Sequence, residues 1–331
     1  DNMVPLVDCD GNYHAMEPMP LQSRPKPQEI MDKTNPDIDY GYVFLNDIYQ
    51  GDGLKGVPRG TVKALRVIEY FYGYRNTGNH HVIAEEGSWD IKRIHGTVKV
   101  EEDGSAFFKA PANRPIAIQP LDKDGNALAL MRSWFTIMPG ETQSCVGCHE
   151  SQGMTPTSKP ALAGRKRPQE IKNFVAGVRG YSYKRDVQPV LDKYCVGCHD
   201  GSKEGRPNFK RGPAVFQTVR EAEGFDQSYL DLMRYVRRSG PESNQHMLSP
   251  LEFHSSTSEL MQLLEKGHKG VKLDKQSMDI LRTWIDLNVP YHGVWTEVYK
   301  KIPWNDHKRR EWALAKYANR HDDQNAINYD G

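Results

Sequence analysis

The chain has 331 residues, with 44 basic and 43 acidic side chains and a hydrophobic fraction of 37%. This length allows two domains of ordinary size, and the near balance of charge gives no indication of binding to nucleic acid or to an anionic membrane surface. No run of about eighteen apolar residues predicts a transmembrane segment. The low hydrophobic fraction, together with 28 Gly and 21 Pro residues, is typical of a loop-rich protein whose interior is partly filled by a cofactor.

Residues 1–40 are rich in proline and polar side chains, show no sustained hydrophobic period, and are predicted to form an extended lead-in. The chain starts at Asp1 and has no apolar signal region, so we expect a processed or partial chain. Cys9 and His14 are a weak indication of a metal site, and we interpret Cys9 as a buried, inert thiol.

Short apolar runs rich in β-branched and aromatic residues follow, beginning at Tyr42 and Val62. A third run begins at Thr97 and has Asp103-Gly104 between two alternating segments, which predicts a hairpin. A second predicted hairpin has residues 124–126 at its tip. We therefore predict an antiparallel β-sandwich-like domain over residues 41–140.

After this domain the hydrophobic period changes to that of helices, so the predicted fold class is α+β. Residues 141–180 are interpreted as the first of two Cys-Val-Gly-Cys-His motifs with a connector. Residues 181–331 contain the second motif and are interpreted as a mostly α-helical, cytochrome c-like domain. A capping box is predicted at Ser256 to Glu259, and Asp274 is the expected N-cap of a later helix. The predicted helices cover residues 186–194, 255–268, 274–290 and 306–318.

The sequence Cys-Val-Gly-Cys-His occurs twice, at residues 145–149 and 195–199. In c-type cytochromes this pattern supplies two thioether bonds to the haem vinyl groups and an axial imidazole on iron. Residues three apart lie on one face of a helical turn, so both sulfurs reach the vinyl groups while the histidine turns beneath the ring. We predict two covalently bound haem c groups, attached through Cys145, Cys148 and His149 and through Cys195, Cys198 and His199.

Two alternatives involve the same four cysteines. A structural zinc site would need a shorter gap than that between Cys148 and Cys195, and would not require the two histidines. Two disulfides are disfavoured because a bond within Cys-x-x-Cys is strained, and no thioredoxin-like βαβ pattern precedes either pair.

Each iron needs a sixth ligand or an open position. For the second haem we predict His268, at the end of an amphipathic helix, with Met247 as the alternative axial ligand. His268 also fits the role of a surface histidine at a helix C-terminus, and His246 and His254 are nearby competitors.

The first iron has a natural proximal ligand in His149. An open coordination position is an alternative to any distal ligand at this iron. The distal candidates are His80, His81, His95 and Met154.

Three segments resemble the hydrazine synthase alpha subunit family: GVPRGTVKALRVIEY, the stretch from WDIKRIHG to SCVGCHE, and LEKGHKGVKLDKQSMDILRTWIDLNVPYHG. The resemblance runs from about Tyr42 to Asn319. It implies a β-rich middle domain, two c-type haems and an N-terminal β-propeller. We expect the lead-in to follow such a propeller, or the propeller to belong to another chain.

The resemblance carries Cys145, Cys148, His149, Cys195, Cys198 and His199 onto the family's two haem motifs, and His268 onto the histidine before its VKL segment. It also implies a reaction centre at the first haem, with a tyrosine shortly after the motif and a zinc nearby. Here Glu150 follows the motif and the next tyrosine is Tyr181, which argues against hydrazine chemistry. A zinc or calcium ion remains a further cofactor hypothesis.

The sequence therefore predicts a periplasmic or otherwise extracytoplasmic dihaem c-type cytochrome. It would transfer electrons between its haems and a partner redox protein, as a subunit of a larger redox complex. The alternative is an oxidoreductase that acts on a small nitrogen or oxygen species at an open first haem, so whether the chain is an enzyme is left open.

Overall fold

The computed structural model describes residues 7, 11, 16–17, 19–77, 82–85, 90–173, 177–216, 222–240, 243, 247–302 and 306–327. The chain divides into two units, Asp1–Lys33 and Thr34–Gly331. In the first unit, the described residues form no helix or strand. Cys9 and His14 lie outside the described residues. The elements below all belong to the second unit.

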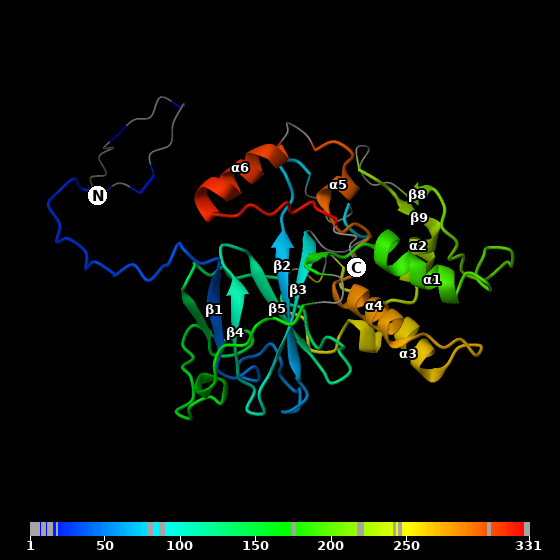
Figure 1. Cartoon of the computed structure of the whole chain (residues 1–331), viewed down its shortest axis with the longest axis horizontal. Coiled ribbons are helices and arrows are strands. Elements are labelled where there is room, and N and C mark those ends of the chain that lie inside the picture. The colour runs from blue at the N-terminus through cyan, green and yellow to red at the C-terminus, as the bar shows by residue number, and fades with distance from the viewer. Residues whose placement is uncertain are drawn as a thin grey trace, which may run out of the picture. The chain divides into compact units, whose positions relative to one another are not determined.

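Two sheets form the β part of this unit (Figure 1). The first sheet has the order β4-β1-β6, in which β1 is antiparallel to β4 and parallel to β6. The second has the order β5-β2-β3-β7 with antiparallel pairs throughout. Two short strands, β8 and β9, pair separately. The strands are β1 (Tyr40–Leu45), β2 (Ala64–Phe71), β3 (Ile91–Lys99), β4 (Ala106–Pro111), β5 (Ile116–Leu121), β6 (Thr142–Cys145), β7 (Arg179–Gly180), β8 (Ala214–Phe216) and β9 (Phe225–Asp226).

The two larger sheets share an apolar core. Leu45 from β1, Phe108 from β4 and Val67 from β2 are fully buried in the same cluster. Branched and aromatic side chains on alternate positions favour this face-to-face packing. The parallel pairing of β1 with β6 departs from the all-antiparallel prediction, because the chain passes through the other sheet before it returns beside β1.

The predicted hairpin around Asp103-Gly104 is wrong. The turn forms, since the Gly104 amide donates to the Glu101 carbonyl at 2.9 Å, but β3 pairs with β2 and β7 while β4 pairs with β1. The turn therefore connects two sheets, and alternating hydrophobicity does not distinguish this from a hairpin. At the second predicted hairpin, the turn at the tip forms. Within the described residues, the segments on either side of this turn pair with each other only through isolated β-bridges, such as that between Leu121 and Ala127.

The helices lie mainly after the sheets in the sequence, so the fold is α+β as predicted. Asp274 caps its helix as predicted, because its Oδ1 accepts from the Ser277 amide at 2.7 Å. The predicted capping box is wrong: Ser258 is the N-cap of α3, and Ser256 lies in a preceding 3-10 turn. The helices are α1 (Gln188–Tyr194), α2 (Gln227–Met233), α3 (Glu259–Lys266), α4 (Lys275–Asp286), α5 (Trp295–Val298) and α6 (Asp306–Ala318), with a π turn at Tyr183–Val187 and 3-10 turns at Ala163–Arg165 and Ser255–Thr257.

One large apolar cluster joins the helices to the second sheet. Trp284 from α4 and Tyr229 from α2 are fully buried in the same cluster as Ile68 and Tyr70 from β2. The predicted domain boundaries at residues 140 and 180 therefore lie inside one packed unit, Thr34–Gly331. The division into domains at these residues stays a prediction. Within the described part of the chain, every helix is too short or too polar to cross a bilayer.

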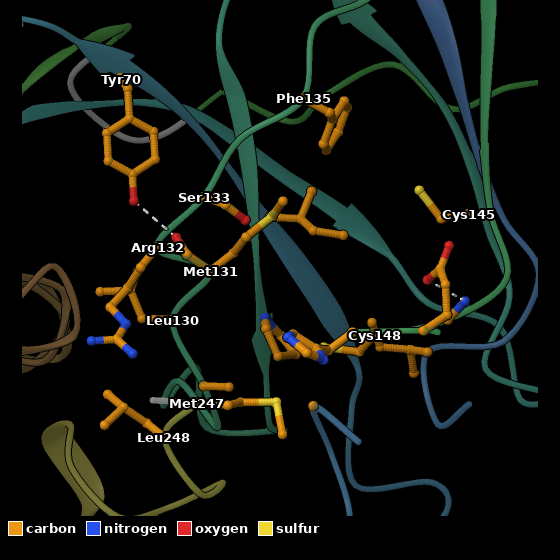
Figure 2. Close-up of a pocket in the computed structure, with 18 of the residues that line it drawn as sticks. Tyr70, Leu130, Met131, Arg132, Ser133, Phe135, Cys145, Cys148, Met247 and Leu248 are labelled. Carbon is orange, nitrogen blue, oxygen red and sulfur yellow. Dashed lines mark hydrogen bonds between the residues drawn. The ribbon is translucent and has the colours of Figure 1, made fainter. Parts of the chain in front are cut away.

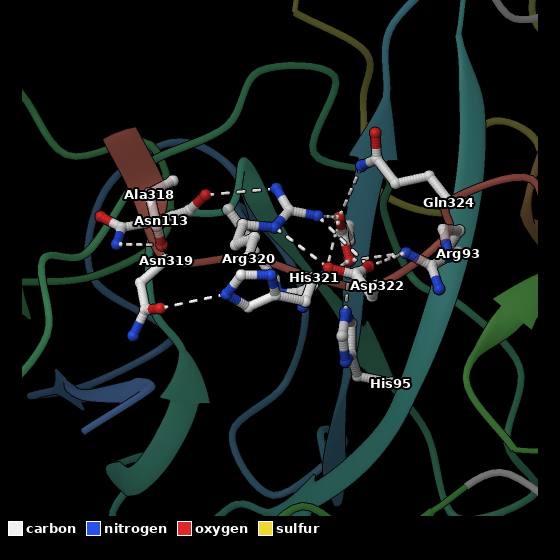
Figure 3. A network of polar contacts seen from close by, with 11 residues as sticks. Arg93, His95, Asn113, Ala318, Asn319, Arg320, His321, Asp322 and Gln324 are labelled. Carbon is white, nitrogen blue, oxygen red and sulfur yellow. Dashed lines mark hydrogen bonds and ion pairs between the residues drawn. The ribbon is translucent and has the colours of Figure 1, made fainter. Parts of the chain in front are cut away.

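A buried carboxylate on β2 holds the C-terminal segment against the second sheet (Figure 3). Glu69 is fully buried and receives hydrogen bonds from Arg114 at 3.0 Å and Arg320 at 2.9 Å, with His95 Nε2 at 2.9 Å. Burial alone would raise the pKa of Glu69, but the His95 hydrogen bond and the charges of Arg114 and Arg93 outweigh it and lower this pKa to about 2. The network therefore depends on an ionised Glu69.

We expect Glu69→Gln to destabilise the protein by about 3–5 kcal/mol, because it removes the fully buried charge that pairs with Arg93, Arg114 and Arg320. The partly exposed Asp322 also pairs with these arginines and would remain. Glu69 stabilises the folded state above its ordinary pKa of 4.5, and this contribution is lost as the pH falls towards 2. The variant should therefore lose less stability than the wild type over this range, as measured by urea unfolding at a series of pH values. Asp124→Asn, at an exposed turn, is the matched control and should cost at most about 1 kcal/mol.

Candidate haem-binding sites

The first Cys-Val-Gly-Cys-His segment begins at the C-terminal end of a strand. Cys145 is the last residue of β6 and lies opposite Leu45 of β1, and residues 146–149 form a bend. The expected helical turn is therefore wrong for this copy. The reason is that β6 pairs with β1 up to Cys145, which holds the backbone extended at the first cysteine.

The loop after β1 runs along the same segment and fixes it by main-chain hydrogen bonds. The Asn46 amide donates to the Cys145 carbonyl at 2.9 Å, the Cys148 amide donates to Gln50 at 2.8 Å, and the Gly53 amide donates to Cys148 at 3.0 Å. A Cβ at Gly53 would overlap the Cys148 sulfur. The glycine thus permits this close approach.

Glu150 completes the turn at the first motif. Its carboxylate accepts hydrogen bonds from the amides of Val146 at 3.1 Å and Gly147 at 3.0 Å. Burial raises the pKa of the Cys145 and Cys148 thiols to about 11, and the Glu150 charge adds to this effect. Both sulfurs are therefore neutral thiols in an apolar setting, unlike the acidic thiols of redox-active disulfide pairs.

These thiols open onto a cavity of about 900 Å³ (Figure 2). Its volume is near the upper end of the range of about 300–1,000 Å³ that is typical of ligand pockets. The walls combine apolar side chains with a few charged groups. The lining residues are Ile48, Gly53, Tyr70, Asp90, Lys92, Ile118, Pro120, Ala129, Leu130, Met131, Arg132, Ser133, Phe135, Cys145, Gly147, Cys148, His149, Glu150, Ser239, Met247, Leu248 and Asn288.

This cavity changes the set of candidate ligands for the first iron. Met247, predicted as an alternative ligand for the second iron, lies in its wall, as does Met131, which sequence reasoning missed. His95 is instead buried beside Glu69, and Met154 is not among the lining residues. The other two distal candidates, His80 and His81, lie outside the described residues.

The second motif continues a helix, as expected. Helix α1 ends at Tyr194, and the amides of Cys198 and His199 donate to the Cys195 carbonyl at 3.1 and 3.0 Å. This turn brings the two cysteines to one side. Cys195 is partly buried against the large apolar cluster, whereas Cys198 is exposed.

The structure brings His199 and His268 together. Their ring centres lie 6.1 Å apart, with an angle of 28° between the ring planes. The Nδ1 atom of His199 is 3.3 Å from the Pro207 carbonyl oxygen, and Phe209 packs on the ring with centres 5.0 Å apart. A hydrogen bond from Nδ1 leaves Nε2 free as a metal ligand and fixes the ring's orientation.

The segment that carries His268 is anchored to the second motif. Helix α3 ends at Lys266, and His268 lies in the following turn, which the Val271 amide closes at 2.9 Å from the His268 carbonyl. Further along, Asp274 accepts hydrogen bonds from Tyr194 at 2.7 Å and from Lys193 at 3.1 Å. These two contacts connect the end of α1 to the start of α4 and so hold the two histidines near each other.

The remaining candidates do not form a metal site in the described part of the chain. The two motifs pack on different apolar clusters, and the described residues contain no group of three or more His, Cys, Asp or Glu side chains arranged to hold a metal. The four-cysteine zinc site is therefore not formed. His254 is buried, and its pKa is lowered by burial, while His246 lies outside the described residues.

Residues 60–150 match the family profile of the hydrazine synthase alpha subunit middle domain. The hydrazine synthase alpha subunit of Kuenenia stuttgartiensis is 21% identical over 268 residues, covering 61% of this chain. A solved structure of hydrazine synthase from the same organism matches with a TM-score of 0.55 and 19% identity over 76% of this chain. The resemblance to the hydrazine synthase alpha subunit family is confirmed.

The match has a defined extent. The profile of the hydrazine synthase alpha middle domain covers β2 to β6 and the first motif. The chain spans 33% of the length of the curated relative and 43% of the matched chain in the structure. The structural likeness therefore concerns the fold of this part.

We expect Gly53→Ala to destabilise the protein by about 1–3 kcal/mol, because the new methyl group overlaps the Cys148 sulfur and the surrounding backbone is fixed. Gly153→Ala is the matched control, since a Cβ there meets no heavy atom within 4 Å. Urea unfolding of the two variants and the wild type measures the difference. Equal midpoints for both variants would contradict the close packing of the loop on the first motif.

Proposed function

We propose that this chain is a dihaem c-type cytochrome built on a hydrazine synthase alpha-like scaffold. The observation that carries the proposal is the spacing of His199 and His268, whose ring centres are 6.1 Å apart. Two imidazoles bonded at about 2 Å on opposite sides of one metal ion place their ring centres about 6 Å apart. These two side chains therefore fit the axial positions of one haem iron, with Cys195 and Cys198 as the attachment sites.

The first haem would occupy the cavity beside Cys145 and Cys148. The cavity volume of about 900 Å³ and its apolar walls suit a porphyrin, and His149 lines it as the proximal candidate. For the sixth position the wall offers Met247 and Met131, unless the iron is left open on that side. The proposal for Met247 thus moves from the second iron to the first.

The favoured role is electron transfer. Haem supplies one-electron chemistry, and the protein sets ligation, burial and surroundings. One apolar cluster contacts both sites: it includes Tyr70 of the first cavity, and both Met131 of that cavity and Cys195 of the second motif pack against it. A continuous packed interior of this kind would connect the two haems. We propose that the partner is a redox protein, that other subunits share the complex, and that the location is periplasmic or otherwise extracytoplasmic.

A second candidate function is catalysis at the first haem. It is favoured by the size of the cavity and by the likeness to an alpha subunit of hydrazine synthase. In this case an open first iron would act on a small nitrogen or oxygen species. The tyrosine that the family resemblance implies after the motif is absent, because Glu150 follows His149 and holds the backbone turn.

We expect His268→Ala to convert one of two low-spin haems to a high-spin form, because it removes an axial ligand from the second iron. Absorption and electron paramagnetic resonance spectra of the purified protein measure the spin state. His321→Ala, an exposed histidine that contacts Asn319, is the control and should leave both haems unchanged. Identical spectra for His268→Ala and the wild type would refute the second-site assignment.

Carbon monoxide binding separates the two functions. We expect the dithionite-reduced wild type to contain two haems and to bind no carbon monoxide if the first iron is closed by a methionine. Stoichiometric binding at one haem would favour the enzymatic candidate. Intact mass under denaturing conditions provides the haem count, and a chain at the mass of its amino acids alone would refute both functions.

A further inference from the structure

The two stretches that carry His199 and His268 are rich in basic side chains. Residues 192–211 and 265–275 together hold nine basic and five acidic side chains, whereas the whole chain has 44 and 43. The structure describes every residue of both stretches. Asp274 accepts hydrogen bonds from the end of α1 and so holds the two stretches together. Their charges therefore act as one basic surface.

The side chains of this basic surface reach into solvent. All nine basic residues are exposed. Three of them form ion pairs with aspartates in the described part of the chain, and these are Lys193, Arg211 and Lys275. The other six are Lys203, Arg206, Lys210, Lys266, Lys269 and Lys272. Of the five acidic side chains, Asp192, Glu265 and Asp274 are held in ion pairs, which leaves Asp200 and Glu204 beside these six cations within the two stretches.

The centre of the basic surface is neutral and partly apolar. Residues 194–198 carry no acidic or basic side chain. Val196 and Leu273 are half-buried against the large apolar cluster, and Cys198 is exposed. A haem attached through Cys198 would have this edge near the surface. An apolar centre inside a polar rim is the usual arrangement of a protein interface.

The first motif has different surroundings. Cys145 and Cys148 are both half-buried and line the cavity. Residues 141–155 hold two acidic side chains, Glu141 and Glu150, and no lysine or arginine. Because like charges disfavour association, an acidic protein would approach the second motif rather than the first.

We propose that the basic surface at residues 192–211 and 265–275 docks an acidic redox protein, which exchanges electrons with the haem attached at the second motif. This inference rests on the proposed function of that motif. Opposite charges steer the two proteins together and raise the association rate constant. The neutral centre allows the two cofactors to approach closely, and the attraction weakens as salt is added.

The test follows electron transfer to cupric plastocyanin, a blue-copper protein with an acidic surface, by stopped-flow absorption. One electron leaves a ferrous haem, which becomes ferric, and reduces Cu(II) to Cu(I). The triple variant Lys203→Glu/Lys210→Glu/Lys272→Glu reverses three charges of the basic surface and retains His199 and His268. At an ionic strength of about 0.01 M, we expect its second-order rate constant to be about tenfold or more below that of the wild type. Added salt should slow the wild type and reduce this difference.

The matched control is Lys159→Glu/Lys301→Glu/Lys308→Glu, which changes the net charge equally at exposed lysines outside the basic surface. It should retain most of the wild-type rate constant. A small cationic oxidant, tris(phenanthroline)cobalt(III), should show the opposite sign and react faster with the first triple variant. Equal rate constants for the two triple variants with plastocyanin, or a wild-type rate that does not respond to salt, would overturn the inference.

Two further measurements separate this inference from the proposed function. Intact mass establishes whether haem is attached to Cys195 and Cys198, and its absence refutes the proposed function together with this inference. Absorption spectra of the first triple variant should match the wild type, since the three lysines are exposed. Isothermal titration calorimetry measures the binding of plastocyanin to the oxidised protein without electron transfer, and we expect weaker binding for this variant alone. Attached haem with equal binding by both triple variants overturns the inference alone.

A last arm distinguishes an acidic protein from an anionic membrane. Vesicles of phosphatidylserine and phosphatidylcholine are sedimented with the wild type and both triple variants. We expect no binding that depends on the basic surface. Vesicle binding that only the first triple variant loses, with unchanged plastocyanin kinetics, would assign the surface to a membrane and overturn the inference.

Discussion

Covalent attachment of a porphyrin requires two sulfurs and one imidazole at fixed positions, and under the proposed assignment the two motifs would supply them from two different backbone settings. At the first motif, strand pairing with β1 and main-chain bonds from the loop at residues 46–53 hold an extended segment. At the second, a helical turn continues α1 and presents Cys195 and His199 directly. The same five-residue sequence therefore takes its geometry from its surroundings, because the motif is too short to determine its own backbone.

The second requirement is an interior that keeps both sites in place. Trp284, Tyr229 and Tyr70 belong to one buried cluster that joins the helices to β2. Tyr70 also donates a hydrogen bond to the Met131 carbonyl at 2.9 Å, which positions the wall of the first cavity. Glu69 is the residue before Tyr70 in β2, so its side chain points to the other face of the strand, where its network holds the C-terminal segment. Disturbance of β2 would therefore affect both sites and the C-terminal segment together.

Local signals predicted what depends on local physics. The N-cap Asp274, helix α1 before the second motif and the α+β class all follow from periodicity and capping. Long-range features were not predictable in this way. The turn at Gly104 connects two sheets, and a hydrophobic pattern does not state which strand is the partner. Lys92 of β3 and the adjacent pair Met131 and Arg132 reach the first cavity from two segments that are far apart in the sequence, so no spacing rule brings them together.

Under the proposed assignments the two sites have different electrostatic surroundings, and this difference gives electron transfer a direction. The second iron would have two imidazole ligands beside an exposed Cys198, a setting that favours the oxidised form. The first would lie in a cavity whose wall carries the thioether sulfurs of Met131 and Met247, and ligation by one of them would favour the reduced form. Electrons would then move from the second haem to the first. The first site is therefore where electrons would accumulate, whether they pass on to a partner or are used in a reaction there.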